Sequence, residues 1–490
     1  MSAGRFAKNA LSNVVTGTSS AVLAIILPYF FVRYLDGVEF SLWVLVLQLG
    51  TYVNYLNFGV QTAIGRYVAF ALGRQDETYA KQILGAGIQI LTSLGGIGLL
   101  VIAGLAWIFP VLFRSVPANL LGSARETLLW IGGALALGLP FTAYLGVFVG
   151  LQRNELPAII SGIGRIILGA GLIFSAMTHD LVTVARVYFF LNLGIYIAQY
   201  ITFRRIKSEW RGSWRQVSPA ARRELTFYCV SLTAWSLSML LINGVSTSLV
   251  GIFDFAAVAS FGVAITAVNF FVGLINSLLA PLIQIFSKAN AASESQKEMK
   301  LLNVFSFLST FFLALCGSYV FVLSGYLMNL WVGATISTAA LPLFYVLSVS
   351  NIIRNTQTPY ALYLIASGQQ RRVILTPVLE GVVNFGVGIV AAQYIGAMGV
   401  AIGALCGSTM GVVANFFYNF KRTLPENFDP HKYFLFTLLT PLLFSLPVVA
   451  VSAASVYLGI NLVISFGIMS ILAAVTAVVI WRGKTLDGIR

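Results

Sequence analysis

The chain has 490 residues, of which 58% are hydrophobic and 9% charged, and its formal net charge is +14. A soluble protein carries roughly 25% charged residues, so the composition excludes an ordinary soluble enzyme. The apolar runs are continuous rather than short and alternating, which excludes a membrane β-barrel. The basic residues lie at the ends of apolar runs and not on one solvated face, so nucleic acid is not an expected partner.

Fourteen apolar stretches follow one another along the chain, and almost every one is long enough to cross a bilayer. A hydrocarbon core of about 30 Å needs roughly 20 apolar residues per helix. The sequence therefore predicts an all-α polytopic membrane protein with about 14 transmembrane helices. The expected bounds are Leu11–Val32, Phe40–Ala63, Ile83–Phe109, Leu128–Leu151, Ala158–Met177, Leu181–Phe203, Leu225–Phe253, Val258–Ser287, Leu301–Trp331, Ala339–Ala366, Val373–Tyr394, Val400–Phe420, Tyr433–Leu458 and Leu462–Trp481.

Lysine and arginine are unevenly divided between the two sides of this predicted bundle. With the N-terminus inside, 23 of the 30 Lys and Arg residues fall on the inner side and four on the outer side, once three within or next to helices are set aside. Short cytoplasmic loops are enriched in basic residues. The distribution predicts a multi-pass membrane protein with both termini and the segment Lys207–Glu224 in the cytoplasm.

Similar residues recur at a separation of about 218, which predicts an internal repeat. Six helices lie between the two copies, so both copies have the same orientation and form two parallel halves. We expect an N-terminal lobe at 1–206, a cytoplasmic linker at 207–224, a C-terminal lobe at 225–422, and an appended helical hairpin and tail at 423–490. The recurring pairs are Asp36 with Asp254, Gly150 with Gly368, Arg204 with Arg422 and, one residue off, Pro140 with Pro359.

Polar residues inside the predicted helices are the candidate substrate-binding residues. Charge within hydrocarbon is costly, so such groups usually face a cavity or a partner. Numerous uncharged amides accompany them, while embedded carboxylates are few. This pattern predicts a water-filled, mildly cationic cavity, which suits a substrate with a sugar part and a phosphate better than an organic cation. The candidates are Arg66, Arg165, Asn351, Arg354, Asn355 and Glu380.

Each charged candidate also has a structural alternative. Arg165 either faces the cavity or is satisfied by backbone carbonyls or by a carboxylate such as Glu380. Glu380 either pairs with Arg165 or Arg354, or carries protons. Arg66, at the inner end of its helix, is expected to extend toward the lipid headgroups.

The polar stretch Asn351–Pro359 surrounds Arg354. Proline has no N–H, so Pro359 leaves the carbonyl of Asn355 without its helical partner. Arg354 therefore either faces the cavity beside this break or packs within a polar kink.

No metal site, disulfide, catalytic group or cofactor is expected. The two histidines, His179 and His431, lie far apart in sequence. The three cysteines, Cys229, Cys316 and Cys406, fall inside apolar runs and show no paired spacing.

Several short segments, spread over nearly the whole chain, carry a family resemblance: Arg5–Asn13, Phe31–Trp43, Leu56–Ala69, Gly150–Arg153, Ser367–Arg371 and Pro281. They resemble segments of bacterial polysaccharide transporters, the O-antigen flippase family within the multidrug, oligosaccharidyl-lipid and polysaccharide exporter superfamily.

The resemblance implies a secondary transporter rather than an enzyme. Its expected activity is to flip an undecaprenyl-pyrophosphate-linked oligosaccharide across the plasma membrane by alternating access, for O-antigen or exopolysaccharide synthesis. Expected partners are the lipid-linked oligosaccharide, the membrane, and glycan polymerase and chain-length proteins.

Two other functions stay open. A multidrug or cation antiporter of the same superfamily needs acidic cavity residues, of which few exist, and fourteen helices rather than twelve make it less favoured. A membrane glycosyltransferase or glycan polymerase needs a sizeable outer loop with carboxylates. The longest outer loop, about Pro110 to Glu126, has only Arg114, Arg125 and Glu126 charged.

Overall fold

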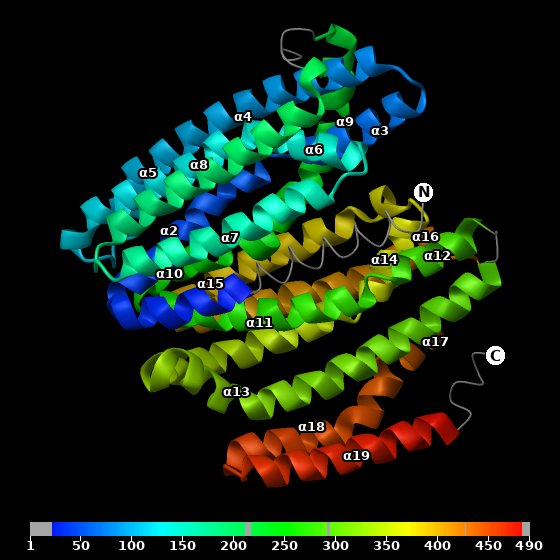
Figure 1. Ribbon diagram of the computed structural model, residues 1–490. Coiled ribbons are helices and arrows are strands. Elements are labelled where there is room, and N and C mark those ends of the chain that lie inside the picture. Colours follow the sequence, from blue (N-terminus) through cyan, green and yellow to red (C-terminus); the bar gives the residue numbers. More distant parts are fainter. Residues whose placement is uncertain (1–21, 211–216, 292–294, 427, 483–490) are drawn as a thin grey trace. The chain divides into compact units, whose positions relative to one another are not determined.

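The computed structural model describes residues 22–210, 217–291, 295–426 and 428–482 (Figure 1). Within these ranges the chain is almost entirely helical and contains no strand. Nine described helices are long and apolar enough to cross a membrane, or ten if the bent pair Pro219–Val230 and Leu232–Gly244 is one span. Two of the nine, 72 and 54 residues long, each contain two of the predicted helices. The predicted all-α membrane architecture is confirmed.

The chain divides into two compact units, Met1–Gly262 and Val263–Arg490. Unit 1 begins, in its described part, with the helix Val22–Tyr34; the first half of the predicted helix Leu11–Val32 lies outside the described residues. The other helices of unit 1 are α2 (Gly37–Tyr55), α3 (Val60–Gly73), α4 (Glu77–Leu112), α5 (Leu121–Gly138), α6 (Thr142–Gly150), α7 (Glu155–Ala176), α8 (Leu181–Ile206), α9 (Pro219–Met239) and α10 (Ser246–Phe253).

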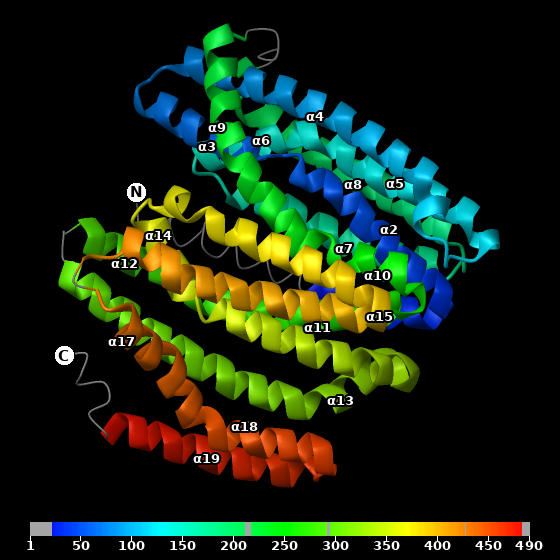
Figure 2. The same cartoon turned by 180° about the vertical axis from the view of Figure 1, so that it is seen from behind.

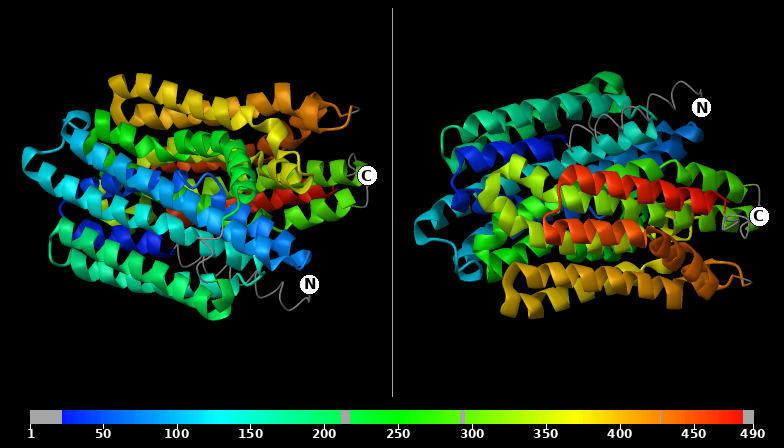
Figure 3. Two further views of the ribbon diagram at one scale, coloured as in Figure 1. Left: turned by 90° about the horizontal axis from the view of Figure 1, so that it is seen from above. Right: turned by 90° about the horizontal axis from the view of Figure 1, so that it is seen from below.

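Unit 2 begins within α11 and ends with a pair of adjacent helices, α18 and α19, which also pack against α13 (Figure 3). The expected lobe bounds remain a prediction. Contacts within the described structure place α9 on α3 and α4 and therefore in unit 1. The helices of unit 2 are α11 (Val258–Leu279), α12 (Leu282–Ala291), α13 (Ser295–Asn355), α14 (Thr358–Ala366), α15 (Leu375–Ala414), α16 (Phe420–Thr423), α17 (Pro430–Phe434), α18 (Thr440–Leu458) and α19 (Leu462–Arg482).

Two of these helices are interrupted where the sequence predicts loops. α13 contains a non-helical residue at Gly333, with φ 78° and ψ 168°. α15 is interrupted at Ile395 and Gly396, where Gly396 has φ 55°. Glycine adopts positive φ without the steric cost of a β-carbon, so both chain reversals fall at glycines. Each long helix is thus a pair of spans.

The same short helix occurs once in each unit. α6 and α14 are both nine residues long, and they begin at Thr142 and Thr358. In both units a proline interrupts the helix at this point: Pro140 lies in the 3₁₀ turn before α6, and Pro359 lies in the first turn of α14. α3 packs on α6 in unit 1, and α12 packs on α14 in unit 2. The same local arrangement therefore occurs in both units.

The turns after these two short helices fix the register of the repeat. Gln152 and Gly368 each follow the start of their short helix at the same distance along the chain, and both have positive φ. In each turn the N–H of the following residue donates to a carbonyl five residues earlier: Arg153 to Phe148 and Gln369 to Leu364, both at 2.9 Å. Gly150, which the sequence pairs with Gly368, lies within α6, where a β-carbon would be 2.8 Å from Val68. Gly150 is thus a packing residue, and the structural counterpart of Gly368 is Gln152.

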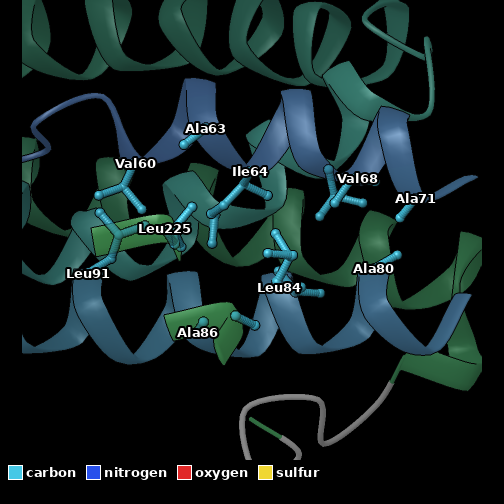
Figure 4. Close-up of a cluster of buried hydrophobic side chains, with 14 of the residues drawn as sticks. Val60, Ala63, Ile64, Val68, Ala71, Ala80, Leu84, Ala86, Leu91 and Leu225 are labelled. Atoms are coloured by element: carbon cyan, nitrogen blue, oxygen red, sulfur yellow. The ribbon is translucent and has the colours of Figure 1, made fainter. Parts of the chain in front are cut away.

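The core of unit 1 near the start of α4 is a dense apolar cluster drawn from α3, α4, α6, α8 and α9, part of which Figure 4 shows. Ile64 of α3, Leu84 of α4 and Leu225 of α9 are fully buried in it. A β-carbon at Gly87 would lie 2.3 Å from Ile64, so the glycine lets α3 approach α4 closely. Close packing of this kind is one of the main interactions that hold helices together in lipid.

Candidate functional site

Arg354 and Glu380 form an ion pair inside unit 2. Nε of Arg354 donates to Oε1 of Glu380 at 2.5 Å. The Glu380 side chain is 10% exposed and that of Arg354 is 26% exposed. Of the two arginine partners left open by the sequence, the structure therefore pairs Glu380 with Arg354. A charge-assisted contact at this depth stabilises both ions against the surrounding hydrocarbon.

Arg354 lies immediately before the break between α13 and α14. Pro359 lacks the N–H that would bond to the carbonyl of Asn355, and the helix is interrupted at Thr356 and Gln357. Amide side chains make local bonds here: Nδ2 of Asn351 donates to the Leu347 carbonyl, and Nδ2 of Asn355 donates to the Asn351 carbonyl. Asn351 and Asn355 thus support the polar break, and Arg354 is held at its edge.

Glycines on the second span of α15 bring it against the first span, which carries Glu380. A β-carbon at Gly407 would lie 2.8 Å from the carbonyl oxygen of Glu380, and one at Gly403 would lie 2.6 Å from that of Asn384. Small residues at four-residue spacing allow membrane helices to approach this closely. The glycines thereby set the position of Glu380 through its backbone.

A buried polar ladder occupies the same unit. Nδ2 of Asn419 donates to Oγ1 of Thr376 at 2.5 Å and to Oδ1 of Asn415 at 2.6 Å. The Thr423 hydroxyl donates to the Asn419 carbonyl and is 2.7 Å from the Tyr360 hydroxyl. The sequence prediction of the site omitted this ladder, although the four-residue spacing of Asn415, Asn419 and Thr423 is a usable signal because it puts them on one helix face.

The remaining two candidates lie in unit 1. Arg165 is half-buried on α7, and Arg66 is exposed on α3, with its guanidinium carbon 5.5 Å from the centre of the Tyr228 ring. Neither belongs to the Arg354–Glu380 pair, which lies in unit 2. The six candidates therefore do not form one cluster within a single unit.

The ion pair can do more than neutralise charge. A guanidinium has five N–H donors in a planar fork, and the bond to Glu380 engages the one on Nε. Because the Arg354 side chain is partly exposed, its remaining face suits an anionic oxygen of a ligand. Among the described residues, no group of three or more His, Cys, Asp or Glu side chains is placed to hold a metal ion.

No protein-family model and no curated protein matches the chain, whereas solved membrane transporters match its structure. The lipid II flippase MurJ, in an inward closed conformation, superposes with a TM-score of 0.73 at 13% identity, over 98% of this chain and 100% of that one. A eukaryotic MATE transporter superposes with a TM-score of 0.62 at 14% identity, over 88% of this chain and 97% of that one.

A second multidrug transporter, a MATE protein of the MOP superfamily in an inward-facing conformation, gives a TM-score of 0.59 at 15% identity over 82% of this chain and 98% of that chain. At these identities the likeness is one of fold. The chain thus has the fold that a lipid II flippase and multidrug transporters share.

Proposed function

We propose that this protein is a secondary transporter that flips an undecaprenyl-pyrophosphate-linked oligosaccharide from the inner to the outer leaflet of a bacterial plasma membrane. The lipid-linked oligosaccharide crosses by alternating access between the two halves of the protein. The product serves the synthesis of a surface polysaccharide, such as an O-antigen or exopolysaccharide, and glycan polymerase and chain-length proteins are the expected partners.

The length of the structural match carries this proposal. The MurJ fold extends over 98% of the chain, including the last helical pair, whereas the MATE folds named above extend over 82% and 88%. The lipid II flippase and this chain therefore share a fold over nearly their whole lengths. The match leaves out only about 2% of this chain, so most of α18 and α19 falls within it.

The charged residues inside the helices also support an anionic substrate. Arg165 and Arg354 outnumber the single Glu380 among the candidates, and Glu380 already pairs with Arg354. Interactions between charges are much stronger in a site of reduced dielectric than in water. Each arginine would therefore repel a cationic substrate that came near it and attract a pyrophosphate.

Deletion of the gene, with complementation by variants, tests the proposal. The null strain should lack a surface glycan and accumulate its lipid-linked precursor on the cytoplasmic leaflet. Arg165→Gln and the neutral pair Arg354→Gln with Glu380→Gln should fail to complement at normal protein level, whereas Arg114→Gln, a change in a predicted outer loop, should complement. Full glycan export with all three of the former changes combined would remove these residues from the mechanism.

A multidrug or cation antiporter is the second candidate. It is favoured by the likeness to MATE folds and by the carboxylate of Glu380 inside unit 2. It predicts that the null strain becomes hypersensitive to several unrelated cationic compounds while its surface glycan stays normal. That outcome would replace the flippase proposal.

A further inference from the structure

α9 crosses α4 in unit 1 (Figure 2), and an open cleft lined by residues of both helices lies at this crossing. Its volume is about 390 Å³. The cleft is distinct from the candidate site above, because none of the six candidates lines it. Its lining residues are Ile88, Gln89, Ile90, Thr92, Ser93 and Arg222.

The packing of α9 on α4 fixes Arg222 at this cleft. Leu225, one turn further along α9, is fully buried and lies 3.7 Å from the position of a β-carbon on Gly87. The Tyr79 hydroxyl donates to Oε2 of Glu224 at 2.7 Å, which ties the same turn of α9 to the start of α4. Residues three apart lie on the same helix face. Arg222 therefore lies on the face of α9 from which Leu225 packs against α4.

The lining residues combine one cation with hydroxyl, amide and apolar groups. The Thr92 and Ser93 hydroxyls donate to carbonyls one turn back on α4, at 2.7 Å and 3.1 Å. Each hydroxyl rotates freely enough to donate to a ligand instead, because those carbonyls keep their main-chain partners. Ile88 and Ile90 add apolar surface beside them. Such a lining suits a molecule that has both an anionic head and a hydrocarbon part.

The cleft lies in the first half of α4, toward the end that carries Glu77 and Lys81. α4 has 36 residues and is therefore about 54 Å long, which exceeds a hydrocarbon thickness of about 30 Å, so the helix extends beyond the hydrocarbon core. Gln89 is about 18 Å from the start of α4. Arg222 is in the first turn of α9. Basic pockets between membrane helices at this level bind anionic headgroups.

We propose that the α4–α9 cleft binds the phosphate headgroup of an anionic membrane phospholipid. The Arg222 guanidinium takes the phosphate oxygens, Thr92 and Ser93 donate hydrogen bonds, and Ile88 and Ile90 contact the first carbons of the acyl chains. This site does not depend on the substrate proposed above, so either proposal can fail alone.

Native mass spectrometry of the full chain in detergent, titrated with phosphatidylglycerol, tests the site. Arg222→Gln should weaken the tightest phosphatidylglycerol adduct about tenfold, because a charge-assisted hydrogen bond to phosphate is lost. Arg223→Gln removes the same charge from the adjacent position, which does not line the cleft, and should bind as the wild type does. Thr92→Val with Ser93→Ala should give an intermediate loss.

Two further arms identify the source of the phosphate. Phosphatidylcholine should not compete for the tightest adduct, since its headgroup has no net negative charge, and inorganic phosphate should compete only weakly. Equal phosphatidylglycerol binding by wild type and Arg222→Gln would overturn the proposal, as would an equal loss in Arg223→Gln. Full competition by inorganic phosphate would show a free-anion site and overturn the lipid assignment. Comparison of the intact variants by thermal unfolding separates lost binding from lost folding.

Discussion

Ile195 fills the space in front of Gly164, where a β-carbon would lie 2.5 Å from its Cγ1 atom. This contact joins α7 to α8 in unit 1. At the corresponding positions of unit 2 the arrangement is exchanged: Glu380 supplies the side chain and Gly411 supplies the space, with a β-carbon there 3.0 Å from Oε2. In both units a large side chain packs against a glycine at this point. The large side chain is on the second helix of the pair in unit 1 and on the first in unit 2.

The ion pair should be replaceable as a pair but not one residue at a time. Glu380→Gln alone leaves Arg354 without its charged partner, so the free energy of unfolding should fall by about 3–5 kcal/mol. Arg354→Met with Glu380→Leu removes both charges and should leave stability near that of the wild type. Thermal unfolding in detergent measures both effects. A loss in the double variant as large as that in Glu380→Gln would contradict the expectation that the unpaired charge of Arg354 causes the loss.

The glycine contact on α15 should be sensitive to one methyl group. Gly407→Ala places a carbon 2.8 Å from the Glu380 carbonyl, a backbone atom that cannot move aside, and should destabilise by about 1–3 kcal/mol. Gly386→Ala is the matched control on the same helix, because no atom lies within 4 Å of its new carbon. Alanine favours helix over glycine there by about 1 kcal/mol. A stable Gly407→Ala protein would contradict the close approach.

Arg125 should stabilise the C-terminal end of α4. Pro110 has no N–H for the carbonyl of Ala106, and Nε of Arg125 donates to that carbonyl at 2.8 Å, while Nη2 bonds Trp107 at 2.9 Å. Arg125→Ala should therefore cost about 1–3 kcal/mol of stability. The cost should shrink in a Pro110→Ala background, where the new N–H bonds Ala106. An unchanged cost in that background would show that Arg125 acts through other contacts.

Topology is testable in a background without Cys229, Cys316 and Cys406. A cysteine at Gln75 should resist a membrane-impermeant reagent added outside, and one at Asn461 should react, because the basic loops are expected to face the cytoplasm. Permeabilised cells serve as the control for reactivity. Labelling of the Gln75 position from outside would reverse the predicted orientation. The linker residue Ser213 lies outside the described residues, so Gln75 represents the predicted inner side.

The helices could be predicted from the sequence because continuous apolar runs leave few alternatives to transmembrane helix. The repeat could also be predicted, but its register could not. Gly150 and Gly368 look equivalent in sequence, yet one packs inside a helix and the other adopts positive φ in a turn. Glycine serves both purposes, so only the fold distinguishes them.

The contacts that the candidate residues make could not be predicted from the sequence. The sequence left both Arg165 and Arg354 as possible partners of Glu380. The packing of α13 on α15 brings Arg354 to Glu380. The ladder around Asn419 was missed because uncharged amides are common in membrane helices and usually bond locally. A search for polar residues at four-residue spacing on one face would have found it.

The pairs Gly164–Ile195 and Glu380–Gly411 have the glycine and the large residue in opposite order. This reversal constrains how homologues of this chain diverge. A duplicated half can move a side chain from one helix to the other only if the opposing position shrinks at the same time. Positions 380 and 411 should therefore covary across homologues, with a small residue at one whenever the other is large. Arginine at 354 should disappear from those lineages in which 380 has become glycine, since the cation then has no counter-ion in hydrocarbon.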